Sequence, residues 1–195
     1  MKKKEYHHGD LRKELIEKGI ELINDKGKEA FSLRKVAEKC GVSNAAPYSH
    51  FRNKEDLIET MQIYVFNLLG NELEKIRRNY ENSPEILLKL GKGYILFFCN
   101  YPQYHSFIFS GKNVKIDLSL DNIQNIDNKA INILKETAVG FFEKLNFSKE
   151  MIQNKIIAMW ALVEGLATLV TMSDMNYDEE WEIKIEEILS SVIIA

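Results

Sequence analysis

The sequence predicts an all-α protein of about nine helices. Only three prolines and ten glycines occur in 195 residues, and long stretches contain neither. Apolar residues recur at three- and four-residue spacing along most of the chain, a pattern that is typical of amphipathic helices rather than strands. The hydrophobic fraction of 45% is large enough to fill a core.

Cap residues and apolar spacing predict two helices at the start of the chain. Asp10 is expected to cap the first, which Gly27 ends. Ser32 is expected to cap a short second helix, and Gly41 supplies the positive φ that the turn after it requires. The two helices should pack together through their apolar faces.

Two further helices are predicted in the next forty residues. A short third helix is expected from Asn44 to Phe51, with Pro47 near its first turn, where the missing N–H costs least. Asn53 is then expected to cap a fourth helix that reaches about Tyr80, with Asp56 as the carboxylate partner of that cap. This long helix should connect two domains rigidly.

The remainder of the chain is also predicted to be helical. Ser83 followed by Pro84 indicates a helix start. Segment 111–122 is expected to be a loop. The helices are expected at about 84–99, 102–110, 123–146, 148–172 and 179–194.

Charge is unevenly divided along the chain. The net charge is −3, but residues 1–55 contain 13 Lys and Arg against nine Asp and Glu, an excess of four positive charges. The rest of the chain is acidic. A basic end on an acidic body favours a protein that binds nucleic acid through that end.

The second and third predicted helices form a helix-turn-helix, because a turn that contains glycine joins two short helices. In this motif the second helix of the pair enters the major groove while the first crosses the DNA backbone. Small side chains early in the reading helix allow close approach to bases, and hydrogen-bonding side chains beside them can read base edges. The residues expected to bind DNA are Ser32, Arg34, Asn44, Ala45, Ala46, Tyr48, Ser49, His50 and Lys54.

Several spaced motifs resemble the TetR/AcrR family of transcriptional regulators. They are Tyr6-His7-His8-Gly9-Asp10-Leu11-Arg12, Ser32-Leu33-Arg34-Lys35-Val36-Ala37, Cys40-Gly41-Val42-Ser43, Ala46-Pro47-Tyr48-Ser49-His50-Phe51 and Lys54-Glu55-Asp56-Leu57. The first of these motifs is similar to one subgroup that often carries Trp-x-x-x-His-Gly near the C-terminus. Here that stretch has Glu164 in place of the His, between Trp160 and Gly165.

The resemblance implies a DNA-binding domain at 6–66 and a ligand-binding and dimerisation domain at 67–195. It implies a homodimer through the helices at about 148–172 and 179–194, which fits the apolar residues that surround the first of them. Such a dimer would bind double-stranded palindromic operator DNA with its reading helices roughly 34–36 Å apart. A repressor released by an unknown small-molecule effector is the function it implies.

The effector is expected to bind among the aromatic residues of the C-terminal domain, because ligand pockets are mainly apolar with a few polar groups. Spacing alone leaves open which aromatics enclose a void and which fill the core. Glu164 could bond across the dimer, contact the ligand or face solvent. The candidate ligand-binding residues are Phe98, Tyr101, Tyr104, His105, Phe142, Trp160 and Glu164.

Other interpretations explain less of the sequence. A metal site at His7 and His8 lacks further ligands at suitable spacing, so we expect no metal or cofactor. Cys99 and His105 lack an orienting third group, so we expect no enzyme. The alternative function is a dimeric interaction protein with a vestigial helix-turn-helix. Unpaired cysteines, no signal peptide and no membrane span predict a cytoplasmic protein.

Overall fold

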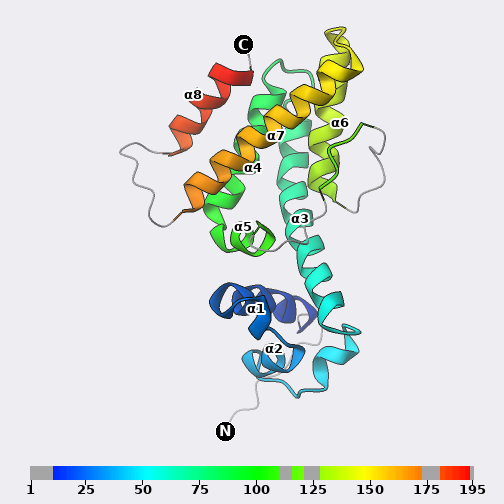
Figure 1. Ribbon diagram of the computed structural model, residues 1–195, viewed down its shortest axis with the longest axis vertical. Helices are drawn as coiled ribbons and strands as arrows, with labels where there is room; N and C mark the ends of the chain where they lie inside the picture. The colour runs from blue at the N-terminus through cyan, green and yellow to red at the C-terminus, as the bar shows by residue number, and fades with distance from the viewer. Residues whose placement is uncertain (1–10, 110–115, 121–127, 173–180, 194–195) are drawn as a thin grey trace.

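The computed structural model describes residues 11–109, 116–120, 128–172 and 181–193. These ranges contain eight α-helices, two short 3-10 helices and no strand, which confirms the all-α prediction (Figure 1). The helices are α1 Leu11–Lys26, α2 Leu33–Lys39, α3 Lys54–Asn79, α4 Ile86–Asn100, α5 Pro102–Phe109, α6 Lys129–Lys144, α7 Lys149–Thr171 and α8 Trp181–Ile193, and the 3-10 helices are η1 Lys28–Ala30 and η2 Ala46–Ser49.

The first two helices form where the sequence predicts them. α1 ends before Gly27, which has a φ of 76°. Ser32 caps α2, since its Oγ accepts a hydrogen bond from the Lys35 backbone N–H, and Gly41 follows with a φ of 68°. The predicted cap Asp10 lies outside the described residues. Local signals therefore fix the entry to the helix-turn-helix.

The predicted third helix, Asn44 to Phe51, is wrong in kind and length. The structure has only the four-residue 3-10 helix η2, Ala46–Ser49. Pro47 has no N–H to donate, and the N–H groups of Ala46 and Tyr48 bond to carbonyls three residues back. The Ser49 hydroxyl donates to the Ala46 carbonyl at 2.6 Å, which also favours the tight turn.

α3 runs through both parts of the molecule, from the bottom to the top of Figure 1. Asn53 caps it as predicted, because its Oδ1 accepts from the Asp56 N–H at 2.8 Å. The Asp56 carboxylate, however, accepts from the backbone N–H of Arg52 at 2.7 Å and not from that of Asn53. We call residues 11–66 the head and the described residues from 67 onward the body.

The body packs its helices around α4, which is mostly buried and contacts α3, α5, α6, α7 and α8. α4 begins at Ile86, two residues later than expected, because the Ser83 Oγ accepts from the Glu85 N–H and forms a turn first. Ser148 caps α7, since its Oγ accepts a hydrogen bond from the Met151 backbone N–H. Of the expected loop, residues 116–119 carry no regular structure, and the remaining positions except 120 lie outside the described residues.

Candidate DNA-binding surface and ligand pocket

The predicted DNA-binding residues lie together on the surface of the head, around α2 and the turn that ends in η2. The structure exposes Arg34, Asn44, Ala45, Tyr48 and Ser49, and Tyr48 is 62% exposed. Pro47, Val36 and Ala37 are buried beneath them. The segment therefore rests on a fixed apolar base and directs polar side chains outward.

Some of these side chains have partners within the head. Ser32 accepts the cap hydrogen bond, which leaves its hydroxyl proton available. Ser49 uses its proton on the Ala46 carbonyl, which leaves lone pairs on its oxygen. The Lys54 ammonium donates to the Lys28 carbonyl at 3.0 Å. It also lies 5.8 Å from the centroid of the Phe31 ring. Lys54 thus has a structural role in addition to any contact with DNA.

Cys40 is a buried residue of the head and is 6% exposed. Burial, the largest cause, raises the pKa of the thiol to about 11. The side chain therefore stays a neutral thiol at physiological pH, which is the form that reacts slowly. Cys40 therefore acts as a small apolar residue of the core of the head.

The structure brings only part of the candidate ligand-binding set together: His105 contacts both Phe98 and Glu164, whereas other candidates lie at separate grooves. Phe98 is fully buried between Tyr94 and His105. Tyr101 and Tyr104 stack on each other at 5.5 Å beside a surface groove between α3 and α4. Phe142 lines a different groove, between α7 and α8. The aromatic residues of the body are therefore spread over its core and its surface grooves.

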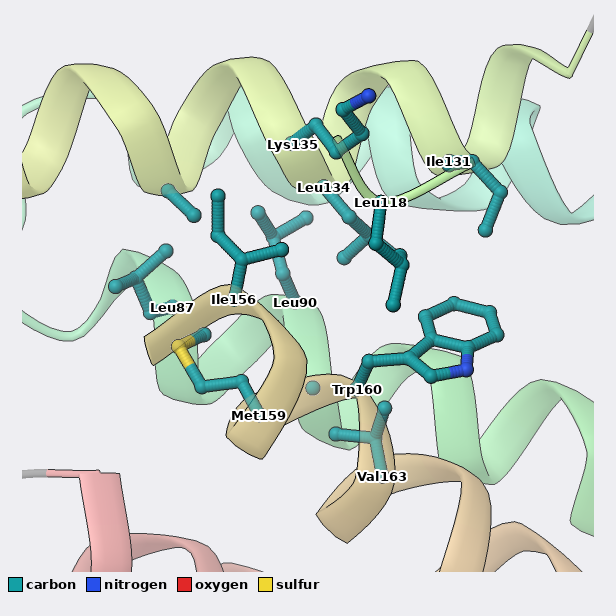
Figure 2. Close-up of a pocket in the computed structure, with 12 residues that line it drawn as sticks. Leu87, Leu90, Leu118, Ile131, Leu134, Lys135, Ile156, Met159, Trp160 and Val163 are labelled. Atoms are coloured by element: carbon teal, nitrogen blue, oxygen red, sulfur yellow. The ribbon is translucent and has the colours of Figure 1, made fainter. Parts of the chain in front are cut away.

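A small apolar cavity lies between α4, α6 and α7, and it contains only Trp160 of the candidate residues (Figure 2). Its volume is about 40 Å³. Figure 2 shows Trp160 at one end and Leu87 toward the other. The lining residues are Leu87, Leu90, Gly91, Leu118, Ile131, Leu134, Lys135, Ala138, Ile156, Met159, Trp160 and Val163.

Sequence reasoning missed most of this lining, because ordinary aliphatic residues at helical spacing look the same whether they enclose a void or fill it. Lys135 was also missed. It is 1% exposed, and its Nζ donates to the Asp117 carbonyl at 3.0 Å while its stem lines the cavity. A lysine at a buried position of an amphipathic helix was the available signal.

Glu164 belongs to a hydrogen-bonded network within the body. The Tyr94 hydroxyl donates to its Oε2 at 2.6 Å, and its Oε1 lies 3.0 Å from His105 Nε2. Burial, followed by the adjacent Glu164 carboxylate, raises the pKa of Tyr94 well above its usual value. His105 Nδ1 is in turn 3.3 Å from the Thr171 hydroxyl. The network ties α7 to α4 and α5.

α5 connects this network to the head. It packs on α1, and the Asn24 side chain donates to the Gln103 carbonyl at 2.8 Å. Within the head, the Tyr64 hydroxyl of α3 donates to Glu17 of α1 at 2.8 Å. The head and body therefore share α3 and a second contact through α5. No group of three or more metal-ligating side chains occurs in the described part of the chain.

α7 exposes an apolar face at the edge of the body. Small residues in its middle are flanked by exposed Ile157, Leu169 and Met172. By length and composition alone α7 could span a membrane, with a mean hydropathy of 1.2, although core helices of soluble folds pass the same test. Only 22% of the most apolar part of α7 is buried within this chain. The exposed small residues are Ala158, Ala161, Gly165 and Thr168.

In the described residues, an all-helical fold with an exposed polar helix-turn-helix, joined by one long helix to a larger body, has the architecture of a helix-turn-helix protein. Within that class, residues 15–61 match the family of bacterial regulatory proteins known as the tetR family.

Curated proteins of known sequence are similar to part of the chain as well. The chain is 30% identical over 82 residues to the uncharacterized HTH-type transcriptional regulator YerO of Bacillus subtilis, covering 41% of this chain and 28% of that protein. The chain spans less than half the length of the curated relatives it matches.

Two solved structures share the fold over nearly the whole chain. The TetR family transcriptional regulator PfmR from Thermus thermophilus has a TM-score of 0.63 at 19% identity, covering 89% of this chain and 93% of PfmR. The transcriptional regulator FadR from Bacillus subtilis, solved with stearoyl-CoA, has a TM-score of 0.63 at 16% identity, covering 92% of this chain and 97% of FadR.

Proposed function

We propose that this protein is a sequence-specific DNA-binding regulator, a repressor that leaves its operator when a small molecule enters the body. The observation that carries the proposal is the exposed surface of α2 and η2. Tyr48, Arg34 and Asn44 lie on it, and their side chains make no hydrogen bond or ion pair with the described residues, above a buried base. The polar groups of this surface are therefore available to bind a partner outside the chain.

A homodimer whose interface is formed by α7 and α8 would place its two heads in successive major grooves of DNA. The apolar face of α7 requires a cover, since a helix that is apolar on most sides is stable only when it is packed on those sides. The small residues Ala161 and Gly165 allow a second helix to approach closely, and no atom lies within 4 Å of the Cβ that Gly165 lacks. When this face contacts the same face of a second copy, the dimer presents two heads to the two halves of a palindromic site.

The route from ligand to DNA runs through α3 and α5. α6 packs on α3 at Gly70, where an added Cβ would lie 2.8 Å from Lys129 Cγ, so a shift of α6 is passed to α3. α3 continues into the core of the head through Met61 and Leu57, which are both fully buried. A ligand that favours one spacing of the two heads would shift the population away from the DNA-bound form.

Two relatives support the ligand-responsive part of the proposal. FadR of Bacillus subtilis shares the fold and was solved with stearoyl-CoA. Part of the chain is 40% identical over 50 residues to the tetracycline repressor protein class C of Escherichia coli. The match of residues 15–61 to the tetR family also supports a regulator rather than an enzyme, and a site of action in the cytoplasm where the DNA lies.

Fluorescence anisotropy with labelled DNA tests the proposal. The probe is the DNA upstream of the protein's own gene, compared with a scrambled fragment at two salt concentrations. We expect tight binding that prefers the native fragment, weakens as salt rises, and saturates at two protomers per site. Equal and weak binding to both fragments at low salt would contradict DNA recognition and favour an interaction protein.

A further inference from the structure

Residues 116–120 lie across the cavity of the body, and one of their side chains occupies part of it. Figure 2 shows Leu118 directed into the space between Leu134 and Trp160. The cavity volume of about 40 Å³ is what remains beside that side chain. Ligand pockets in proteins span roughly 300–1,000 Å³, so a ligand needs more room than the cavity now offers.

Two polar side chains hold this segment in place. The Gln153 amide bonds on both sides of Ser119: its Nε2 donates to the Leu118 carbonyl at 2.8 Å, and its Oε1 accepts from the Leu120 N–H at 3.1 Å. From the opposite helix, Lys135 donates to the Asp117 carbonyl at 3.0 Å. Side chains of α6 and α7 thus hold residues 117–120 from two sides.

Leu118 differs from the other described residues that line the cavity. All of those residues lie on α4, α6 or α7, and the packing of three helices fixes them. Among them, Leu118 alone lies on a segment without regular structure, where hydrogen bonds from Gln153 and Lys135 hold its neighbours. Displacing it costs less than separating two helices, because water can replace hydrogen bonds, whereas separated helices expose apolar surface.

The chemistry of the lining limits what can take the place of Leu118. The walls are aliphatic apart from Trp160 and Lys135, and the Lys135 ammonium is already bonded to backbone. A polar group placed there would lose its water without gaining a partner, which is costly. A hydrocarbon chain loses nothing, and each buried methylene strengthens binding about fourfold.

We propose that Leu118 acts as a built-in occupant of the ligand site, and that the effector displaces it with an alkyl chain. The polar end of that effector stays outside the described cavity walls. This inference rests on the proposed function only in that the bound ligand is taken to be the effector. The binding itself can be measured on the full-length protein without DNA.

Quenching of Trp160 fluorescence by straight-chain 1-alkanols tests the inference, in a Trp181→Phe background so that one tryptophan reports. In the parent protein, affinity should rise about fourfold per added methylene until the chain fills the site. Leu118→Ala should tighten binding of a long alkanol by about tenfold or more, since the occupant is removed. Gln153→Ala should tighten it by about fivefold, since two hydrogen bonds to the segment are lost.

Matched controls separate this outcome from general loosening. Leu145→Ala removes a leucine that is 53% exposed and lies outside the cavity, and Gln103→Ala removes an exposed glutamine from α5. Neither should change alkanol affinity. Ala138→Leu should weaken binding by filling the site, with its fold checked by helical circular dichroism.

The inference is overturned if Leu118→Ala binds alkanols no more tightly than Leu145→Ala. It also fails if correctly folded Ala138→Leu binds as well as the parent, because the alkanol would then lie elsewhere. Loss of preference for operator DNA in the anisotropy experiment would remove the proposed function but would leave these binding results standing. The two failures are therefore distinguishable.

Discussion

The head and the body use their polar residues in opposite ways. In the head, Arg34 on α2 and Tyr48 on η2 project from an apolar buried base, and their side chains make no hydrogen bond or ion pair with the described residues. In the body, Glu164 and Lys135 are bonded inside the fold and contribute little to the outer surface. Exposed polar side chains are available to a partner, whereas buried ones are committed to the structure.

This difference explains why the two parts relate differently to other proteins. The family match covers residues 15–61, which lie within the head, while the chain as a whole resembles solved structures only in fold, at identities of 19% and 16%. If the head fits DNA, as we propose, particular residues of its surface are constrained in sequence. Packing of helices in the body accepts many combinations of apolar residues. Substitutions in each part should therefore have separable effects.

The largest effect is expected from a charge placed on the exposed face of the body. Ala161→Glu puts a carboxylate in the middle of the apolar stripe of α7, where the proposed dimer would bury it without a partner. We expect the dimer dissociation constant to rise by at least about a hundredfold, with loss of operator binding. Sedimentation velocity across a concentration series measures the change.

Lys144→Glu is the matched control, since it places the same carboxylate on the exposed end of α6. It should leave the protein dimeric. The fold of the head should be intact in both variants, as seen by helical circular dichroism. A dimeric Ala161→Glu protein would show that the partner helix packs elsewhere and that the apolar face of α7 has another cover.

A smaller loss is expected from breaking the buried network. Glu164→Ala leaves the Tyr94 hydroxyl and the His105 ring without their shared acceptor in a water-poor site. An unsatisfied buried polar group costs about 1–3 kcal/mol, so we expect the free energy of unfolding to fall by about 2 kcal/mol. Urea denaturation measures it. Glu143→Ala, which removes an exposed glutamate from α6, should change it by less than about 0.5 kcal/mol.

The same contrast shows how far the sequence could predict the structure. Ser32, Gly41 and Asn53 act through bonds or dihedral angles within three residues of themselves, so their roles were predictable. The third helix was mispredicted although its determinants are also local, because Pro47 has no N–H to donate and the Ser49 hydroxyl donates to the Ala46 carbonyl, which favours the tighter turn. Cap and glycine signals were therefore read correctly, whereas the choice between an α-helix and a 3-10 helix was not.

The body resisted prediction for a physical reason. The partners of Glu164 lie 59 and 70 residues away in sequence and come from two different helices. Which aliphatic residues enclose the cavity depends on how α4, α6 and α7 cross, and periodicity does not encode crossing geometry. Only the apolar character of α7 showed in the sequence, as the expectation of a dimer interface.

A clean loss of DNA affinity without loss of stability would sharpen the comparison. Arg34→Ala removes an exposed cation from the proposed phosphate-contacting surface of the head. Affinity should fall about tenfold, and the slope of log affinity against log salt should flatten by about 0.9, the value for one phosphate contact. Fluorescence anisotropy gives both quantities, and thermal unfolding should be unchanged.

Arg78→Ala provides the comparison on the same molecule. Arg78 ends α3 in the body, its side chain is 76% exposed, and it pairs only with Glu74 in the described part of the chain. Its removal takes away the same charge without touching the head. An equal loss of salt slope in both variants would mean that net charge, and not the helix-turn-helix surface, controls binding.

The smallest effect is expected where the body holds charges at its surface. Lys92 and then Lys89 on α4 hydrogen-bond to Glu186 of α8 and lower the pKa of this carboxyl to about 2. A carboxyl whose pKa is lowered by folding stabilises the fold above its ordinary value near 4.5, and that contribution disappears as pH falls toward 2. The Glu186 side chain is 38% exposed, so solvent screening limits the contribution to about 0.5 kcal/mol.

Glu186→Gln should therefore lower stability slightly at pH 7 and leave stability at pH 2.5 closer to that of the parent. Urea denaturation at pH 7 and pH 2.5 measures both differences. Because α8 is part of the proposed dimer interface, the comparison belongs in the monomeric Ala161→Glu background, where dissociation does not contribute to the transition. A difference that is the same at both pH values would assign the effect to packing of the side chain. A difference that vanishes on acidification would assign it to the charges that hold α8 on α4.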